Sequence, residues 1–425
     1  MRTCLHIANL FIAATLLGAC SGDGSKSLSD ASQPDGGGLD AAPDSPQPAT
    51  SDRPVKSITW GSEDVVTTAD LTVAFNNTSI GARDKNDGLH VTWLESQKNI
   101  RYAYLAKGSS AWSLRDVPRT STTAVSKPTL SMNGTTAIVV WNEAGANGVV
   151  AANATADFGA TWAGPLQISE AAGTGASLVA NVSASSFSAS IAWIDSATSR
   201  LKVRAISGAS WSVASLGAVQ TIDANATKPS GDPQIFGAAP SLYVTWDNGE
   251  ETGGHDVHLA QSSDGVHFTN EHLIGVTQAG RTLNSGNDTG GCASGPAVYL
   301  GYQDGNAIYV ARSTDGGKTF EPKGKVGDGL FAHLECLSER AVAVAWESFT
   351  GNNLHNDDVK TVGSVYTLDG FDTNTGPHAI PGSDVQMARI LGTASHSDSF
   401  LDYWWVEKTA SSAKLGHRAA TLTRE

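Results

Sequence analysis

The sequence predicts an all-β protein, a seven-bladed β-propeller that follows an export signal and a polar tether. Three observations predict it. Short strands end in an aromatic residue at regular intervals, apolar and polar residues alternate along them with the period of two that a pleated sheet requires, and a turn built on Ser/Thr, Asp and Gly recurs between them. A regular repeat near 50 residues is typical of four-stranded propeller blades.

The first 19 residues have the pattern of a signal peptide. A short basic start at Arg2 precedes an apolar run from about Leu5 to Leu17. The run ends in LGAC, which resembles the lipobox of bacterial lipoproteins. The resemblance implies that Cys20 is acylated and becomes the first mature residue, so that the lipid is the only membrane anchor. Ser21 implies, by the same resemblance, the outer membrane; an ordinary signal peptide with a chance cysteine is the alternative.

Residues 20–54 contain the lipidated cysteine and a tether. The segment is rich in Ser, Asp, Pro and Gly and nearly free of large apolar residues, so it cannot bury a core. The folded domain is therefore predicted to span residues 55–425. We expect it to be a monomer.

The charge excludes some partners. The formal net charge is -14, whereas a nucleic-acid or anionic-lipid surface needs a basic footprint. A neutral glycan, a basic envelope protein or a cation remains compatible with this charge.

The repeat sets the blade count. Seven strands end in Trp93, Trp141, Trp193, Trp246, Tyr302, Trp346 and Trp405. Their mean spacing is about 52 residues. A surplus strand lies around Trp60, at the start of the domain, while the seventh repeat has no outer strand of its own. Because a closed sheet leaves no exposed edge, we predict that residues 55–66 supply the outer strand of the last blade.

The recurring turn explains the order of strands within a blade. Its residues are Thr155, Asp157, Gly159 and Trp162 in one copy, Ser313, Asp315, Gly317 and Phe320 in a second, and Ser262, Asp264, Gly265 and Phe268 in a shortened third. We expect the carboxylate to accept local N–H groups, the glycine to take positive φ and the aromatic ring to pack between sheets. The motif resembles the Asp-box, or BNR repeat, of bacterial sialidases. The resemblance implies a structural turn between the third and fourth strands, opposite the ligand face, and a six-bladed ring is the alternative that it raises.

The candidate site lies in the longest connections of repeats four to six. The loop "DNGEETGGHDVH" contains Glu250, Glu251, His255, Asp256 and His258, the next connection contains Arg281 and Asp288, and "ESFTGNNLHNDD" contains His355, Asp357 and Asp358. These side chains could form a general acid and base, a carbohydrate-binding rim or a metal site, or be solvated polar loops. No motif of fixed spacing identifies a metal, although a divalent cation such as calcium is a candidate.

A carboxylate follows each anchor aromatic. These residues are Glu95, Glu143, Asp195, Asp247, Asp304, Glu347 and Glu407. They could hold a cation or offer paired carboxylates for glycoside chemistry. We favour the alternative that each one accepts turn amides, because a property of every repeat is more easily architectural than catalytic.

Sialidase activity itself is not expected. That family binds the substrate carboxylate with three arginines, the first in an Arg-Ile-Pro motif near the start of the domain. This chain has no such motif, and the nearest string, Arg389-Ile390-Leu391, lies near the wrong end. The resemblance in fold therefore does not imply sialidase activity.

Two cysteines remain in the folded domain. Cys292 and Cys336 each lie ten residues before an anchor aromatic, which places both on innermost strands of neighbouring blades. An exported protein keeps disulfides. We predict a disulfide between them, with two buried free thiols as the alternative.

Together these features predict an outer-membrane lipoprotein that binds a glycan or an envelope protein through the face opposite the Asp-boxes. The alternative is an enzyme, a glycoside hydrolase or polysaccharide lyase using the same loops. A structural role in the cell envelope is a third hypothesis.

Overall fold

The computed structural model describes residues 54–69, 80–96, 98–121, 125–143, 148–181, 187–224, 230–238, 240–249, 256–276, 289–304, 307–349, 359–372, 378–379, 388–390, 399–408 and 413–424. All of them belong to one compact unit, Pro46–Glu425. Their regular structure is β-strand apart from one 3-10 turn, η1 (Trp211–Val213). No helix within these ranges is long and apolar enough to cross a membrane.

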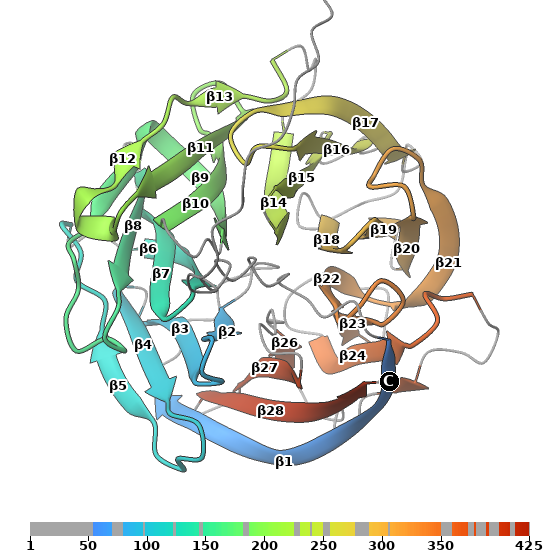
Figure 1. The fold of residues 1–425 in the computed structure, drawn as a ribbon, viewed down its shortest axis with the longest axis horizontal. Coiled ribbons are helices and arrows are strands. Elements are labelled where there is room, and N and C mark those ends of the chain that lie inside the picture. The colour runs from blue at the N-terminus through green and yellow to red at the C-terminus, as the bar shows by residue number, and fades with distance from the viewer. Residues whose placement is uncertain are drawn as a thin grey trace, which may run out of the picture. The chain divides into compact units, whose positions relative to one another are not determined.

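Five of the sheets have four antiparallel strands each. In four of these five, the strands follow one another in sequence order from the centre outward (Figure 1). Blade 1 contains β2 (Gly81–Arg83), β3 (Leu89–Glu95), β4 (Asn99–Leu105) and β5 (Ser113–Asp116). Blade 4 contains β14 (Ser230–Ala238), β15 (Ser241–Asn248), β16 (Asp256–Ser262) and β17 (Phe268–Val276). Blade 5 contains β18 (Thr289–Ser294), β19 (Ala297–Asp304), β20 (Ala307–Ser313) and β21 (Glu321–Asp328). Blade 6 contains β22 (Leu330–Cys336), β23 (Val342–Phe349), β24 (Val359–Thr367) and β25 (His378–Ala379).

A larger sheet joins blades 2 and 3 through one long strand, β9 (Leu166–Asn181). The start of β9 pairs with β8 and its later part pairs with β10, so the strand is outermost in one blade and innermost in the next. Blade 2 also contains β6 (Val125–Asn133), β7 (Thr136–Glu143) and β8 (Val149–Thr155). Blade 3 also contains β10 (Phe187–Asp195), β11 (Arg200–Gly208), β12 (Ser215–Leu216) and β13 (Gln220–Thr221). We divide this sheet at β9 and number the groups of described strands as blades 1 to 7 in chain order.

Blade 7 unites the two ends of the domain. It contains β26 (Ala388–Ile390), β27 (Phe400–Lys408), β28 (Ala413–Arg424) and, outermost, β1 (Val55–Ala69). Strand β1 pairs antiparallel with β28 from Val55 opposite Arg424 to Ala69 opposite Ala413. The predicted outer strand at residues 55–66 is therefore confirmed, and it extends three residues further.

The core lies between the blades. In the described part of the chain, seven hydrophobic clusters each join two adjacent blades, and one of them joins blade 7 to blade 1. The anchor residues Trp141, Trp193 and Trp246 are almost completely buried in these clusters. Innermost strands contact one another from β2 through β6, β9, β14 and β18 to β22. This closed ring of radial sheets, seen in Figure 1, is the β-propeller fold that the sequence predicts.

A disulfide joins two innermost strands. Cys292 in β18 and Cys336 in β22 are bonded, with their Cα atoms 5.3 Å apart. That separation lies within the usual range for disulfides. The predicted pairing is thus present, and it covalently links blade 5 to blade 6.

Candidate functional site

The two ends of each sheet differ in their connections. The turns 155–162, 262–268 and 313–320 each join the third strand of a blade to the fourth, as the resemblance implies. We call the end that carries them the Asp-box face. The other end, where the second strands finish and the third strands begin, we call the opposite face.

The turn at 313–320 has the geometry that its residues predict. The Ser313 hydroxyl donates to Asp315 Oδ1 at 2.7 Å and accepts from the Gly317 N–H at 2.9 Å. Asp315 also accepts from the N–H and the hydroxyl of Thr319, at 2.9 and 2.7 Å. The hydrogen bonds from Thr319 and Ser313 hold the pKa of Asp315 well below its ordinary value. This carboxylate is therefore a permanently charged acceptor for its own turn.

The same turn occurs in four described copies, one more than the sequence motif indicates. Asp157 accepts from the N–H and hydroxyl of Thr161, and Asp264 accepts from the N–H groups of Val266 and His267. In blade 6, Thr367 donates its hydroxyl to Asp369 at 2.6 Å in the same way. This fourth copy has the aromatic residue Phe371 directly after Gly370, so its spacing is shorter than that of the other three.

Each turn also packs against the preceding blade. Gly159 has φ of +84°, and a Cβ there would lie 2.8 Å from the ring of Tyr102 in blade 1. Gly317 has φ of +85°, and its Cβ would lie 3.1 Å from Tyr243 in blade 4. The Asp-box residues thus join neighbouring blades, and their carboxylates accept hydrogen bonds from their own turns.

Most of the predicted site residues fall outside the described residues; these are Glu250, Glu251, His255, Arg281, Asp288, His355, Asp357 and Asp358. The strands that flank them are described. Strand β15 ends at Asn248 opposite Asp256, and Asp256 in turn lies opposite Val276, the end of β17. The strand ends at Asn248, Asp256 and Val276 therefore all lie at the opposite face.

The two described candidates have different surroundings. Asp256 is half-buried at the first position of β16, at the opposite face. His258 stacks on the anchor Trp246, with ring centroids 5.3 Å apart and planes 14° apart, and its Nδ1 lies 3.0 Å from Glu271 Oε1. These contacts place His258 within the sheet of blade 4.

Several carboxylates after the anchor residues serve the fold, as favoured above. Asp195 accepts from the N–H and hydroxyl of Thr198 in the next turn, at 2.8 and 2.7 Å. Glu143 is buried and accepts from the Trp141 indole at 2.8 Å and from Arg119 at 3.2 Å. In these blades the carboxylates satisfy local donors.

The fifth blade departs from this pattern. The other six anchor aromatics are tryptophans with at most 7% of their surface exposed, whereas the fifth is a half-buried tyrosine, Tyr302. Its ring stacks on Tyr309 of β20, with centroids 5.8 Å apart and planes 18° apart. Burial, with smaller effects of Asp304 and Tyr309, raises the pKa of Tyr302, so the phenol stays neutral. Tyr302, Tyr309 and Asp304 form the group that we call the tyrosine platform.

The platform lies at the opposite face, at the end of β19 in blade 5. Asp304 is the last residue of β19, and it pairs with Ala307 at the start of β20. In blade 4 the equivalent position is Asn248, and Asp247, one residue before it, is buried beside Gly231. Two carboxylates of unequal exposure thus lie near the ends of the second strands of adjacent blades. Sequence reasoning treated Tyr302 only as an anchor; the change from Trp to Tyr was the available signal.

A buried polar cluster on the Asp-box face was also missed. His90 lies 3.2 Å from Asp84 and contacts the Tyr102 hydroxyl through its other ring nitrogen, and all three are almost fully buried. Burial lowers the pKa of His90, because it outweighs the effect of Asp84. With no exposed atom, this cluster stabilises the junction of blades 1 and 2.

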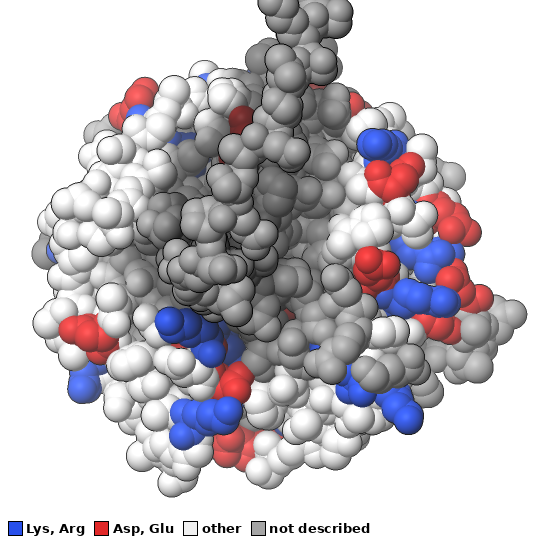
Figure 2. Space-filling view, in the orientation of Figure 1, with Lys and Arg blue, Asp and Glu red and all other residues white. Residues whose placement is uncertain are grey.

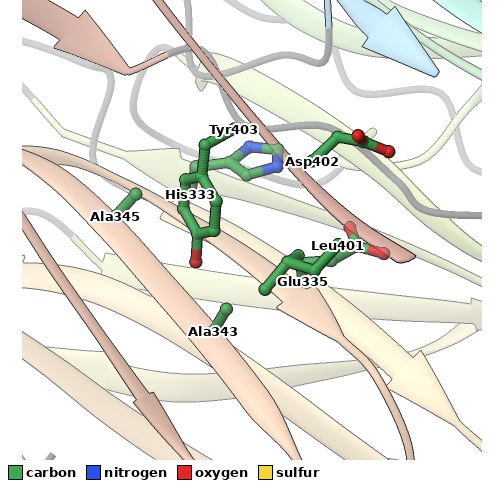
Figure 3. A pocket seen from close by; sticks show the side chains of 7 residues that line it. All are labelled: His333, Glu335, Ala343, Ala345, Leu401, Asp402 and Tyr403. Atoms are coloured by element: carbon green, nitrogen blue, oxygen red, sulfur yellow. The ribbon is translucent and has the colours of Figure 1, made fainter. Parts of the chain in front are cut away.

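A small pocket lies between blades 6 and 7. Its lining residues are His333, Glu335, Ala343, Ala345, Leu401, Asp402 and Tyr403. Figure 3 shows the Asp402 carboxylate turned away from the Tyr403 hydroxyl, as expected for successive residues of one strand. Burial, followed by the charge of Glu335, raises the pKa of Tyr403 well above its ordinary value. With room for about one water molecule, the pocket is too small for a sugar.

The described part of the chain has neither a broad surface of one charge in the view of Figure 2 nor a cluster of metal ligands. Figure 2 shows Lys and Arg interspersed with Asp and Glu around the face that it views, without a broad field of one sign. Among the described residues, no group of three or more His, Cys, Asp or Glu side chains is arranged to hold a metal ion.

No protein-family model and no curated protein matches the sequence. Solved structures with a similar fold include an alpha-L-arabinanase from Penicillium chrysogenum complexed with arabinobiose, with 13% identity and a TM-score of 0.48, covering 74% of this chain and 99% of that chain. A Trypanosoma rangeli sialidase has 11% identity and a TM-score of 0.44, over 83% of this chain and 59% of that chain. An ulvan lyase has 10% identity and a TM-score of 0.45, over 72% of this chain and 82% of that chain.

These neighbours are glycoside hydrolases and a polysaccharide lyase. At such identities and TM-scores the likeness concerns the fold in general, and one fold hosts many functions. The function of this chain must therefore be argued from its own residues.

Proposed function

We propose that this protein binds a glycan at the opposite face, in the sector of blades 4 and 5. One observation carries the proposal: the stacked, half-buried pair Tyr302 and Tyr309 replaces the buried tryptophan that the other blades have at this position. A tyrosine offers an apolar ring face and a polar hydroxyl at one place. Glycan-binding sites need both properties, because a sugar ring has apolar C–H faces and polar hydroxyl edges.

Asp304 provides the polar part of the platform. It is half-buried and ends the strand that carries Tyr302, two residues away and therefore on the same side of the sheet. A carboxylate accepts hydrogen bonds from two adjacent sugar hydroxyls. Together the ring faces and the carboxylate give the few well-placed contacts that a ligand site requires.

The second candidate function is cleavage of the bound glycan. It is favoured by the position of Asp247 and Asp304 at the same end of adjacent blades, one buried and the other half-buried. Glycoside hydrolysis uses two carboxyl groups, one as acid and one as nucleophile or base, in different surroundings. The protein would then be a glycoside hydrolase or a polysaccharide lyase.

Cellular location is part of the proposal. The LGAC motif supports lipidation at Cys20, and the polar segment that follows supports a tether between the lipid and the propeller. The protein would then act at the outer membrane of a bacterium.

Incubation of the purified protein with neutral, acidic and amino-sugar polysaccharides, followed by affinity retention and mass spectrometry, tests the proposal. Retention without new products indicates a binding protein. Products that have gained water indicate a hydrolase, and unsaturated products indicate a lyase. Neither retention nor product with any polysaccharide class would contradict a glycan function.

A further inference from the structure

The first and last blades meet at a buried ion-pair network. Asp402 of β27 is completely buried and receives two hydrogen bonds from Arg83 of β2, at 2.5 and 2.7 Å. His417 of β28 donates its Nε2–H to the same carboxylate at 2.9 Å. The Arg83 guanidinium also lies 4.2 Å from the centre of the Phe400 ring. A single carboxylate thus ties together two strands of blade 7 and the first strand of blade 1.

The network reaches the outer strand β1 through His417. In the pairing of β1 with β28, Asp64 lies opposite His417, and its Oδ2 is 3.9 Å from His417 Nδ1, an ion-pair distance. His417 is 1% exposed, whereas the Asp64 carboxylate is 55% exposed. The imidazole is therefore the only member of the network, within the described residues, that contacts both the centre of blade 7 and β1.

Within the described part of the chain, His417 also contacts two aromatic rings. Trp404 of β27 lies 4.2 Å away between ring centroids, and Trp112 of blade 1 lies 6.3 Å away with its plane nearly perpendicular. The charged groups that face His417 are thus Asp402 on β27, Asp64 on β1 and, behind Asp402, Arg83 on β2. Two carboxylates on opposite sides favour an imidazole that carries a proton at both nitrogens.

We propose that the proton on His417 controls how firmly β1 is held to β28, so that this strand, which closes the ring, separates more readily in alkaline than in mildly acidic solution. When His417 is protonated it links Asp402 to Asp64 across the strand pair. When it loses its proton, the imidazole keeps the Nε2–H that donates to Asp402 at 2.9 Å, and the ion pair between Nδ1 and Asp64, whose atoms lie 3.9 Å apart, is the contact that is lost.

The pKa shifts of these groups determine in which direction pH changes the stability of the pairing between β1 and β28. Burial alone would lower the pKa of His417, but the hydrogen bonds and charges of Asp402 and Asp64 outweigh it and raise the pKa. A raised pKa means that the stabilisation is complete below the unfolded value of about 6.5 and is lost as pH rises through the folded value. The pKa of Asp64, lowered by His417, and that of Asp402, lowered by His417 and Arg83 against burial, keep both carboxylates charged throughout this range.

Hydrogen–deuterium exchange of the full chain tests this inference. Protection of β1 peptides is measured at about pH 6 and about pH 8.5, corrected for intrinsic exchange and compared with peptides of β7 in blade 2. We expect protection of β1, relative to β7, to fall by roughly threefold to tenfold at the higher pH. His417→Gln should abolish this difference, and His267→Gln, which removes an exposed histidine paired with Asp264, should preserve it.

Two results would overturn the inference. One is a parallel change of β1 and β7 with pH in the natural protein, and the other is a natural pH response in His417→Gln. If His417→Gln does not fold, Asp64→Asn gives the answer, because the exposed carboxylate can be neutralised without opening the core. In this variant, β1 should be less protected at pH 6 than in the natural protein, and its protection should change less with pH. An unchanged pH response would contradict the role of the ion pair between His417 and Asp64.

Discussion

Two stacked aromatic pairs lie at opposite ends of the propeller. On the Asp-box face, Tyr104 stacks on Phe158 with ring centroids 4.3 Å apart and planes 17° apart. On the opposite face, Tyr302 stacks on Tyr309 at 5.8 Å and 18°. Each pair contains a half-buried tyrosine, Tyr104 in the first and Tyr302 in the second. Their surroundings nevertheless differ.

The pair on the Asp-box face joins two blades. Phe158 belongs to the turn of blade 2, Tyr104 belongs to β4 of blade 1, and His90 lies 4.9 Å from Tyr104. The platform pair lies within one blade, on directly opposed positions of β19 and β20. Among the described residues, neither of its tyrosines belongs to a hydrophobic cluster between blades, whereas Tyr104 packs against the cluster that joins blades 1 and 2. The comparison teaches that an aromatic pair is a ligand candidate where packing between blades does not require it.

The largest expected effect concerns the scaffold that both faces share. Deleting residues 55–66 removes most of β1, exposes the edge of β28 and uncovers apolar residues of the cluster between blades 6 and 7. We expect the midpoint of thermal unfolding to fall by at least about 10 °C. Deleting residues 21–45 of the predicted tether is the control and should leave the midpoint unchanged. An unchanged midpoint in the first variant would show that β1 does not close the ring.

A smaller effect tests whether the Asp-box face is purely structural. Gly159→Val places a branched side chain at φ of +84° and against Tyr102, so we expect a loss of roughly 2–4 kcal/mol in the free energy of unfolding. Glycan retention by the folded protein should be unaffected. Gly108→Ala is the control, because Gly108 has φ of +75° but no atom within 4 Å of the added Cβ, and it should cost only about 1 kcal/mol. Equal losses in denaturant titrations would refute the steric argument.

The smallest effect concerns a surface network that extends the Asp-box face of blades 5 and 6. Asp372 lies 2.9 Å from Arg312, 2.7 Å from Lys323 and 3.3 Å from Arg340. Hydrogen bonds from Arg312 and Lys323 lower the pKa of Asp372 from 3.8 to about 2. A lowered pKa stabilises the fold above the ordinary value, and the stabilisation is lost as pH falls toward 2.

Asp372→Asn should therefore cost about 1 kcal/mol at pH 7, because the pair is partly screened by solvent. The difference from the natural protein should shrink between about pH 4 and about pH 2. Glu170→Gln, which removes an exposed partner of Arg204, is the control and should have little effect at any pH. A difference that persists unchanged at pH 2 would mean that Asp372 acts through shape rather than charge.

Much of the fold could be predicted because its signals are local or periodic. The anchor spacing, the Asp-box residues and the surplus strand at Trp60 each act within a few residues or at a fixed interval. The disulfide followed from the equal register of its two cysteines. The bond between Arg83 and Asp402 could not be predicted, because 319 positions separate the residues and no motif contains either.

The site could be predicted less well. The long loops of repeats four to six belong to the same sector as the proposed tyrosine platform, but most of their candidate residues lie outside the described residues. Tyr302 was assigned to the scaffold because it occupies an anchor position. Only the structure shows that Tyr302 is half-buried while the other anchors are buried.

The most direct test compares the two aromatic pairs in one experiment. Tyr302→Ala and Tyr104→Ala are assayed in parallel for retention of the polysaccharide that the natural protein binds and for thermal unfolding. We expect Tyr302→Ala to weaken retention by at least about fivefold with little change in the unfolding midpoint, since one lost ring contact is worth roughly 1 kcal/mol or more. Tyr104→Ala should lower the midpoint and leave retention unchanged. The reverse pattern, or equal retention by both variants, would contradict a glycan site at the tyrosine platform.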